Sequence, residues 1–287
     1  MDNKKLKDLT VRTVSGLVLL FVVVGALVWS RWSAAALFAV VMLGGLIEFY
    51  RLCQKKGVAP MYGIGIATSL AAFGLAFAIF YNDGGASLAP AILRIASGAL
   101  LYVMFMIPIT FVCELWRKSA TPIANIATTF MGIIYVALPM AVILYIPQLL
   151  VGEWNAWAML AFISIIWIND IFAYLVGVSI GKHRLCERIS PKKSWEGFFG
   201  GLVGAVGAAV LFGYLFGGNL YVWGGLGLVT ALAGVAGDLV ESLMKREVDV
   251  KDSGKMMPGH GGFLDRFDAL YIAVPFVAIY LLLVGAF

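Results

Sequence analysis

Charged side chains are scarce in this sequence. Asp, Glu, Lys and Arg together make up 13% of its 287 residues, whereas hydrophobic residues make up 62%. Soluble domains carry about a quarter charged residues, and a single soluble core could not hide so much apolar surface. The composition therefore excludes an ordinary soluble protein and predicts an integral membrane protein.

Cysteine and histidine are also rare, with three and two copies. Cys53, Cys113 and Cys186 follow no metal-binding spacing, so we expect free thiols. Two histidines are too few for a His-rich metal site, and the sequence shows neither a Ser-His-Asp spacing nor a Walker A loop. These absences argue against nucleophilic hydrolysis and P-loop chemistry.

Long apolar runs fill most of the chain. About 20 helical residues cross the ~30 Å hydrocarbon layer of a membrane. Runs of that length can be placed at 13–30, 33–50, 61–81, 90–115, 122–149, 155–179, 198–217, 220–240 and 267–286. We therefore expect an all-α, polytopic membrane protein with about nine transmembrane helices. The first run is interpreted as an uncleaved anchor because a second run follows it directly.

The distribution of cations sets the expected orientation. With the N-terminus inside, only Arg31 and Arg94 of the 21 Lys and Arg residues fall outside the cytoplasmic side. Cytoplasmic loops carry such an excess of cations, so the sequence predicts an N-in, C-out topology. This orientation explains the net charge of +5 through anionic lipid head groups, and we expect no nucleic-acid partner.

The polar chemistry is concentrated in the second half of the chain. Residues 1–150 have short loops and are interpreted mainly as scaffold helices. Residues 155–287 contain two polar loops, at about 180–197 and 242–266, which face the cytoplasm in the predicted topology. No internal repeat or low-complexity linker divides the sequence. We therefore expect one transmembrane domain, residues 1–287, with its active site in those loops and the C-terminal helices.

Acids at or inside the apolar runs are the first candidates for chemistry. Asp170, beside Asn169, would cost about 2.5–3.5 kcal/mol at a helix centre, so it needs a partner on a neighbouring helix or a polar cavity. Asp238 and Glu241 share one face of a predicted helix. Two acids so close favour a bound cation, unless Glu241 simply pairs with Lys245.

The loop before the last apolar run has the features of a phosphate site. Lys245, Arg246 and Lys251 lie in or before it, and it ends in P-G-H-G-G. Gly261 and Gly262 would leave backbone N–H groups open toward a ligand, and the next helix N-terminus would add positive potential. We therefore expect phosphate binding here.

Two acids follow in the first turn of the last helix. Asp265 and Asp268 offer the hard oxygen ligands that Mg²⁺ prefers. Acids in a first turn also interact favourably with the helix dipole, so the pair alone leaves both interpretations open. Beside the glycine-rich loop, metal binding is the favoured one.

The other polar loop contains the sequence S-P-K-K-S-W-E-G, starting at Ser190. Lys192 and Lys193 could clamp phosphate, or could only orient the chain as other cytoplasmic cations do. Two adjacent lysines in a tight turn with Trp195 and Glu196 are more than orientation requires. We therefore include this loop among the candidate binding segments.

These residues together resemble the phosphatidate cytidylyltransferases, also called CDP-diacylglycerol synthases. The C-terminal signature of that family matches in order and spacing at Ser242, Lys245, Arg246, Lys251, Asp252, Gly254, Pro258, His260, Gly261, Gly262, Asp265, Arg266 and Asp268. Met257 departs from it, since the family more often has Leu, Ile or Phe there. The W-I-N-D, Gly181-Lys182 and S-P-K-K-S-W-E-G segments also look like the family. The first half of the chain matches only in being polytopic.

The resemblance implies that CTP and phosphatidate react to give CDP-diacylglycerol and pyrophosphate, with Mg²⁺. It implies metal ligands at Asp238 and Asp265, supported by Asp268 and Asp170. Catalytic roles are expected for Asp238, Asp265, Lys251 and His260. Substrate binding is expected at Lys192, Lys193, Ser190, Lys245, Arg246, Gly261, Gly262, Arg266 and Asn169.

The resemblance also implies a place in phospholipid biosynthesis. We expect a bacterial inner (plasma) membrane protein, with membrane lipid as a partner and an active site facing the cytoplasm. Whether a second cation binds, and whether the chain forms a homodimer, stay open.

Two other functions compete with this interpretation. A CTP-dependent lipid kinase would release CDP instead of pyrophosphate. A cation-coupled transporter could use Asp170 and Asp238 as an ion path, because intramembrane acids often line such paths. The transporter leaves the His-Gly-Gly loop unexplained.

Overall fold

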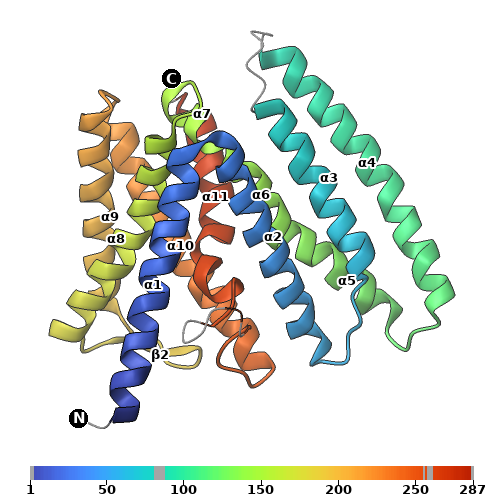
Figure 1. Cartoon of the computed structure of the whole chain (residues 1–287), viewed down its shortest axis with the longest axis horizontal. Coiled ribbons are helices and arrows are strands. Elements are labelled where there is room, and N and C mark those ends of the chain that lie inside the picture. Colours follow the sequence, from blue (N-terminus) through green and yellow to red (C-terminus); the bar gives the residue numbers. More distant parts are fainter. Residues whose placement is uncertain (1–2, 81–87, 255, 257–260, 286–287) are drawn as a thin grey trace.

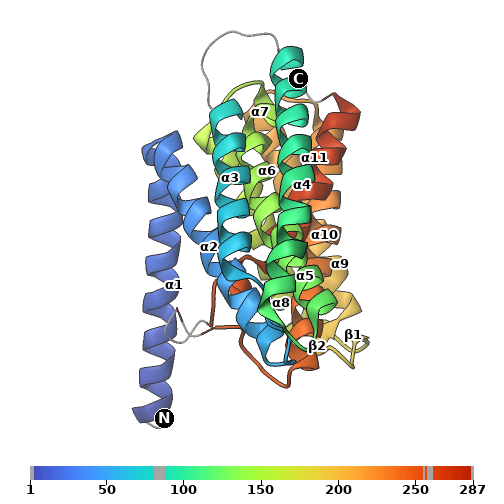
Figure 2. The same ribbon diagram turned by 90° about the vertical axis from the view of Figure 1, so that its right-hand side faces the viewer.

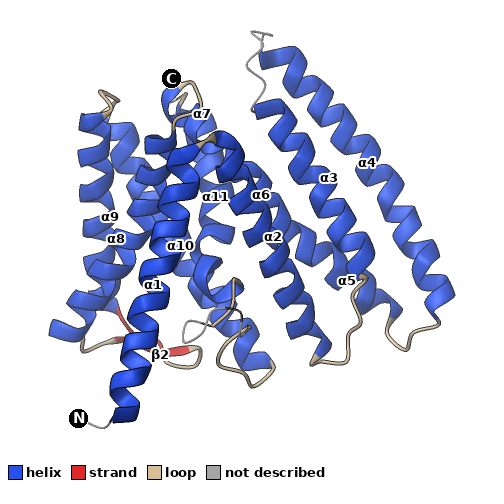
Figure 3. Cartoon of the chain, in the orientation of Figure 1, coloured by secondary structure: helices blue, strands red, loops and turns tan. Residues whose placement is uncertain are grey.

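The computed structural model describes residues 3–80, 88–254, 256 and 261–285. Side chains within 3–12 and 88–96, and those of Phe80, Ala99, Leu100 and Val103, are outside the description. The described chain is a bundle of long helices with one short hairpin (Figures 1 and 3).

The first half of the chain provides four long helices and a broken one. In order they are α1 (Asn3–Trp29), α2 (Arg31–Gln54), α3 (Tyr62–Phe80), α4 (Leu88–Arg117), and the consecutive segments α5 (Pro122–Gly132), η1 (Ile133–Ala137), α6 (Leu138–Val142), η2 (Ile143–Tyr145) and α7 (Ile146–Val151). The second half provides α8 (Ala156–Ile180), α9 (Trp195–Leu215), α10 (Leu220–Glu247) and α11 (Leu264–Val284).

Each expected apolar run lies largely within a helical segment of the described chain. Seven helical segments among the described residues are long and apolar enough to cross a membrane: 31–54, 62–79, 122–151, 156–180, 195–215, 220–247 and 264–284. Thr13–Trp29 is a shorter apolar helix. The polytopic, mainly helical fold is therefore confirmed, whereas nine crossings, the N-in orientation and the single-domain assignment stay predictions.

The segment 122–151 changes helix type where proline interrupts it. Pro139 has no N–H to donate, and just before it the Leu138 N–H bonds the carbonyl of Ile133, five residues back. This wider turn makes η1 a π-helix, a type usually seen as a single turn inside an α-helix. The apolar segment 122–151 thus stays helical through the proline.

The core lies where α11 packs against α2, α6 and α7, and the first half of α8 adds buried side chains beside α7. Its largest fully buried side chains include Phe38, Tyr50, Phe162 and Tyr271. On one flank of the bundle α3 packs beside α4, and on the other α8, α9 and α10 form a group (Figure 1). The C-terminal helices are thus held against a core that the first half of the chain helps to build.

A hairpin, absent from the all-α expectation, forms within the loop between α8 and α9. Its antiparallel strands are β1 (Arg184–Cys186) and β2 (Ser190–Ser194), and Cys186 is paired with Ser190. The hairpin lies at the same end of the bundle as the N-terminus and the end of α10 (Figures 1 and 2). The two polar loops therefore begin at one end of the molecule, as the sequence predicted.

Candidate active site

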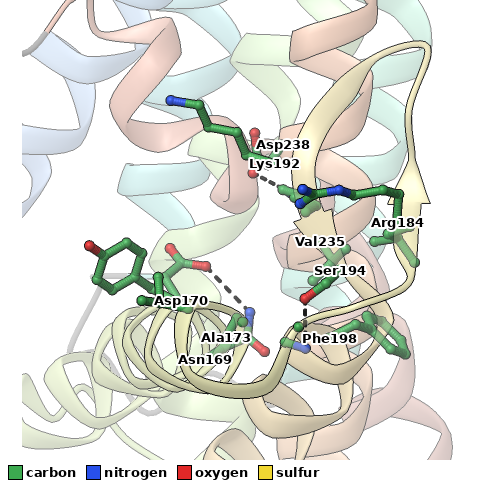
Figure 4. Close-up of a pocket in the computed structure, with 16 residues that line it drawn as sticks. Asn169, Asp170, Ala173, Arg184, Lys192, Ser194, Phe198, Val235 and Asp238 are labelled. Carbon is green, nitrogen blue, oxygen red and sulfur yellow. Dashed lines mark hydrogen bonds and ion pairs between the residues drawn. The ribbon is translucent and has the colours of Figure 1, made fainter.

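A cavity of about 570 Å³ opens between α8, α9, α10 and the hairpin (Figure 4). Its lining includes the charged side chains of Asp170, Asp238, Arg184, Lys192 and Lys193. Aromatic and aliphatic side chains also line it, among them Tyr174, Val178, Leu185, Phe198 and Val235. The cavity can therefore take a ligand with both a charged and an apolar portion.

Glycines bring α8 and α9 close together behind this cavity. A Cβ at Gly197 would lie 2.7 Å from the carbonyl oxygen of Ala173, and one at Gly201 would lie 2.8 Å from Oδ1 of Asn169. Real Cβ atoms do not approach other atoms so closely, so the contact requires glycine. At the start of α9 the Ser194 hydroxyl accepts the Gly197 N–H at 3.2 Å, which caps the helix.

Asp170 faces the cavity, and among the described residues its hydrogen bond comes from its own helix (Figure 4). Its Oδ1 accepts a hydrogen bond from the adjacent Asn169 Nδ2 at 3.3 Å. Asn169 is itself buried, and its Oδ1 has no hydrogen-bond partner among the described residues. Asp170 thus lines the cavity, and its role there stays a prediction.

Lys193 and Asp238 form an ion pair inside the cavity. Their side chains are 25% and 39% exposed, so both groups remain accessible to a ligand. Lys192, the next residue of β2, lines the same cavity, whereas Ser190 lies at the start of the strand. The two lysines of S-P-K-K-S therefore face the site, and their role in binding stays a prediction.

Asp238, Glu241 and Asp268 gather where α10 and α11 come together. Each offers a carboxylate oxygen, and these oxygens lie within 4.8 Å of one another. Gly237 permits this approach, because a Cβ there would lie 2.5 Å from the carbonyl oxygen of Asp268. The structure thus brings Asp238 together with Glu241 and Asp268, whereas the resemblance implies Asp238 and Asp265 as the main metal ligands.

The electrostatics of this group favour a cation. Three carboxylates at such distances repel one another unless positive charge lies between them. Glu241 is fully buried, and its Oε2 pairs with Lys245, whereas its Oε1 has no hydrogen-bond partner within the described residues. Hard oxygen ligands with unused acceptor capacity fit a divalent cation such as Mg²⁺.

Asp265 forms hydrogen bonds with Lys245 and with the loop before α11. Its Oδ1 accepts Lys245 Nζ at 2.7 Å, and its Oδ2 accepts the N–H groups of Gly262 at 2.8 Å and Ser253 at 2.9 Å. The carboxylate therefore holds the loop before α11 to α10. It is not a member of the acidic group above, so its metal-binding and catalytic roles stay predictions.

The glycine-rich loop is described only in part. Gly261 has a φ of +83°, a conformation that glycine adopts readily. The Gly262 N–H is bonded to Asp265, so it does not point at an open site. His260, predicted to be catalytic, and Pro258 lie outside the described residues.

Three other cations that were predicted to act in the site lie at the surface around this loop. Lys251, Arg246 and Arg266 are exposed. Arg246 Nε donates to the carbonyl oxygen of Ile189 at 3.3 Å, which ties the end of α10 to the hairpin. Among the described residues, none of these three lines the cavity, and their phosphate-binding roles stay predictions.

Sequence reasoning missed some lining residues. Arg184 and Phe198 were not among the predicted site residues, yet both line the cavity. Arg184 lies in a cation-rich loop, where membrane orientation already explained positive charge. Only its place on β1 distinguishes it from other loop cations.

Residues 10–284 match the sequence model of the cytidylyltransferase family. The phosphatidate cytidylyltransferase of Staphylococcus aureus (strain COL) is 47% identical over 120 residues, which cover 41% of this chain and 46% of that protein. Those of Mycobacterium bovis and Mycobacterium tuberculosis are 42% identical over 117 residues, covering 40% of this chain and 38% and 35% of those proteins. The matches thus span less than half the length of these relatives. They confirm the resemblance carried by the C-terminal signature.

Proposed function

This chain belongs to the cytidylyltransferase family, and from that premise we propose that it is a phosphatidate cytidylyltransferase. It would join CTP and phosphatidate into CDP-diacylglycerol and release pyrophosphate, a step of phospholipid biosynthesis. The similarity to phosphatidate cytidylyltransferases of other bacteria supports this choice of substrates.

The observation that carries the proposal is the acidic group beside a cavity lined by both charged and apolar side chains. Asp238 belongs to both, since it lines the cavity and joins Glu241 and Asp268. A reaction between a nucleoside triphosphate and an anionic lipid needs positive charge to offset repulsion between phosphates. It also needs an apolar wall beside the lipid.

Asp238, Asp268 and Glu241 would hold Mg²⁺, with Asp170 nearby in the cavity. The metal would neutralise charge on the triphosphate as the bond to its α-phosphorus changes. Lys193 and Lys192 would bind phosphate oxygens, and Lys193 would exchange part of its contact with Asp238 for them. Arg184 adds a fixed cation at the cavity wall.

The attacking atom would be a phosphate oxygen of phosphatidate. A phosphate monoester is largely ionised near neutral pH, so no protein base has to remove a proton from it. The oxygen attacks the α-phosphorus of CTP, and the bond to the β-phosphate breaks with pyrophosphate as leaving group. The protein then acts mainly through orientation and charge.

The same proposal places the site at the inner leaflet of a bacterial plasma membrane. The end of the bundle with the hairpin would face the cytoplasm, where CTP is present, and lipid would enter from the leaflet beside it. The excess of cations at this end supports that orientation.

The test is a product assay with purified protein in detergent. Labelled CTP, phosphatidate and Mg²⁺ should give a labelled lipid together with pyrophosphate. Release of CDP with a phosphorylated lipid would show a lipid kinase instead. Absence of a labelled lipid, combined with cation flux in sealed vesicles, would favour the transporter.

A further inference from the structure

Glu48 lies in the half of the chain that the sequence assigns to scaffold, yet it contacts the loop before α11. It is a carboxylate in the apolar α2 and only 4% exposed. Buried acids are costly unless they are paired or hydrogen-bonded. Its partners therefore identify what it stabilises.

Those partners belong to the C-terminal loop and helix. Glu48 Oε2 accepts the N–H of Leu264, the first residue of α11, at 2.8 Å, and the Ser253 hydroxyl lies 3.3 Å from the same oxygen. Phe263, at the N-cap of α11, makes no side-chain capping bond. A negative charge at a helix N-terminus is favourable, so Glu48 caps α11 from another helix.

The backbone around the carboxylate is shaped to admit it. A Cβ at Gly254 would clash with Glu48 Oε1, and a Cβ at Gly262 would clash with Oε2. One turn earlier on α2, Gly44 makes room for the ring of Phe263. The loop therefore follows the α2 surface closely on both sides of the undescribed residues.

Contacts extend from Glu48 toward the acidic group. The Ser253 hydroxyl lies 2.9 Å from Asp265 Oδ2, and Asp265 Oδ1 accepts Lys245 Nζ at 2.7 Å. Lys245 in turn pairs with Glu241. A displacement of the loop would reach the carboxylates of α10 and α11 through this chain of neighbours.

We propose that Glu48 is a positioning residue that docks the loop before α11, and the start of α11, onto α2. Docking fixes Asp265 and Lys245 on one side and the register of α11, which carries Asp268, on the other. The consequence for catalysis rests on the proposed function, whereas the docking itself does not.

Docking is tested by limited trypsin digestion of the purified full chain in detergent. Trypsin can cut after Lys251, two residues before Ser253, and the fragment that begins at Asp252 is quantified by mass. Glu48→Ala should speed this cut about tenfold, because cleavage follows local opening. Glu48→Gln keeps a carbonyl oxygen for Leu264 and Ser253 and should stay within about threefold of wild type.

Glu114→Ala is the matched control. Glu114 is another buried carboxylate of the first half, and it accepts hydrogen bonds from Asn125 at 2.6 Å and Ser119 at 2.5 Å, away from the C-terminal loop. Its loss should lower thermal stability but leave the rate of cutting after Lys251 unchanged. Equal acceleration in the two alanine variants would overturn the proposal.

Catalysis is then measured on the same variants. At matched folded fraction, kcat with CTP should fall about tenfold in Glu48→Ala and recover in Glu48→Gln, as expected for a misplaced site, with Glu114→Ala near wild type. Faster cutting with an unchanged kcat would overturn the positioning role. If Glu48→Ala does not fold, Glu48→Asp, too short to reach Leu264, should show both effects. A wild-type chain without product refutes the proposed function while the digestion still reports on docking.

Discussion

At the scale of single residues, Asp268 is the acid whose role depends most directly on charge. It shares the acidic group with Asp238 and Glu241, and its backbone lies against Gly237 of the neighbouring helix. Asp268→Asn keeps the shape and removes the charge that a divalent cation needs. Losing a residue that only supports a metal ligand already costs about 10- to 100-fold. For a direct ligand we therefore expect product formation to fall at least about a hundredfold.

The measurement for Asp268→Asn is the rate of labelled lipid formation across a range of Mg²⁺ concentrations. Glu153→Gln, an exposed acid between α7 and α8, is the control and should behave as wild type. An unchanged rate in Asp268→Asn would remove the metal assignment for this group.

Lys245 is the counter-charge of two acids and should matter for stability. It contacts Glu241 and Asp265, and its side chain is 15% exposed. Lys245→Met leaves both acids without this partner, and breaking a buried pair in this way costs about 3–5 kcal/mol of unfolding free energy.

Thermal unfolding in detergent measures this loss. Lys56→Met is the comparison, because Lys56 pairs with Glu247 at 3.9 Å and its side chain is 47% exposed. Exposed pairs contribute about 0–1 kcal/mol, so the midpoint should hardly move. Equal shifts in the two variants would contradict the buried-pair interpretation.

Sequence reasoning found most acids of the site because acids in apolar runs are conspicuous. It placed Asp238 beside Glu241 from helical spacing alone. It put Asp265 ahead of Asp268 as a metal ligand, whereas in the fold Asp265 holds the loop and Asp268 joins the acidic group. Sequence reasoning alone could not connect Glu48 with this loop, because its partners lie more than 200 positions away in the chain.

At the scale of elements, Gly237 lets α10 approach the backbone of α11 beside the acidic group. A Cβ at Gly237 would lie 2.5 Å from the Asp268 carbonyl oxygen, a backbone atom that cannot rotate away. Gly237→Ala should therefore push the helices apart and separate Asp238 from Asp268. We expect at least about a tenfold loss of kcat, since small misplacements are costly in active sites.

Gly234→Ala is the matched control for Gly237→Ala, because its Cβ would meet Ala269 Cβ at an ordinary 3.7 Å. Both changes raise helix propensity equally, so a difference in rate isolates the packing effect. Similar activity in the two variants would contradict it.

The helices were predictable because a run of about 20 apolar residues has few alternatives in lipid. The ends of the helices were harder to predict than their existence. The apolar run was placed at 220–240, but α10 continues to Glu247, because a helix can extend past the apolar run into polar surroundings. The π-turn η1 and the hairpin have no apolar signature. The π-turn depends on Pro139, and the hairpin depends on pairing between two strands that the sequence places in one loop.

At the scale of the whole molecule, the orientation predicted from cations has a direct test. Cys186 lies on β1 at the end of the bundle that carries the cavity, and Glu153 is exposed in the loop between α7 and α8. A helix of 25 residues, α8, separates the two loops, which is long enough to span a bilayer. With the N-terminus inside, Cys186 should react with a membrane-impermeant thiol reagent in inside-out vesicles, and Glu153→Cys should react in right-side-out vesicles. Cys53→Ala and Cys113→Ala remove the other thiols. The reverse labelling pattern would put the acidic group on the side without CTP, which the proposed reaction cannot accommodate.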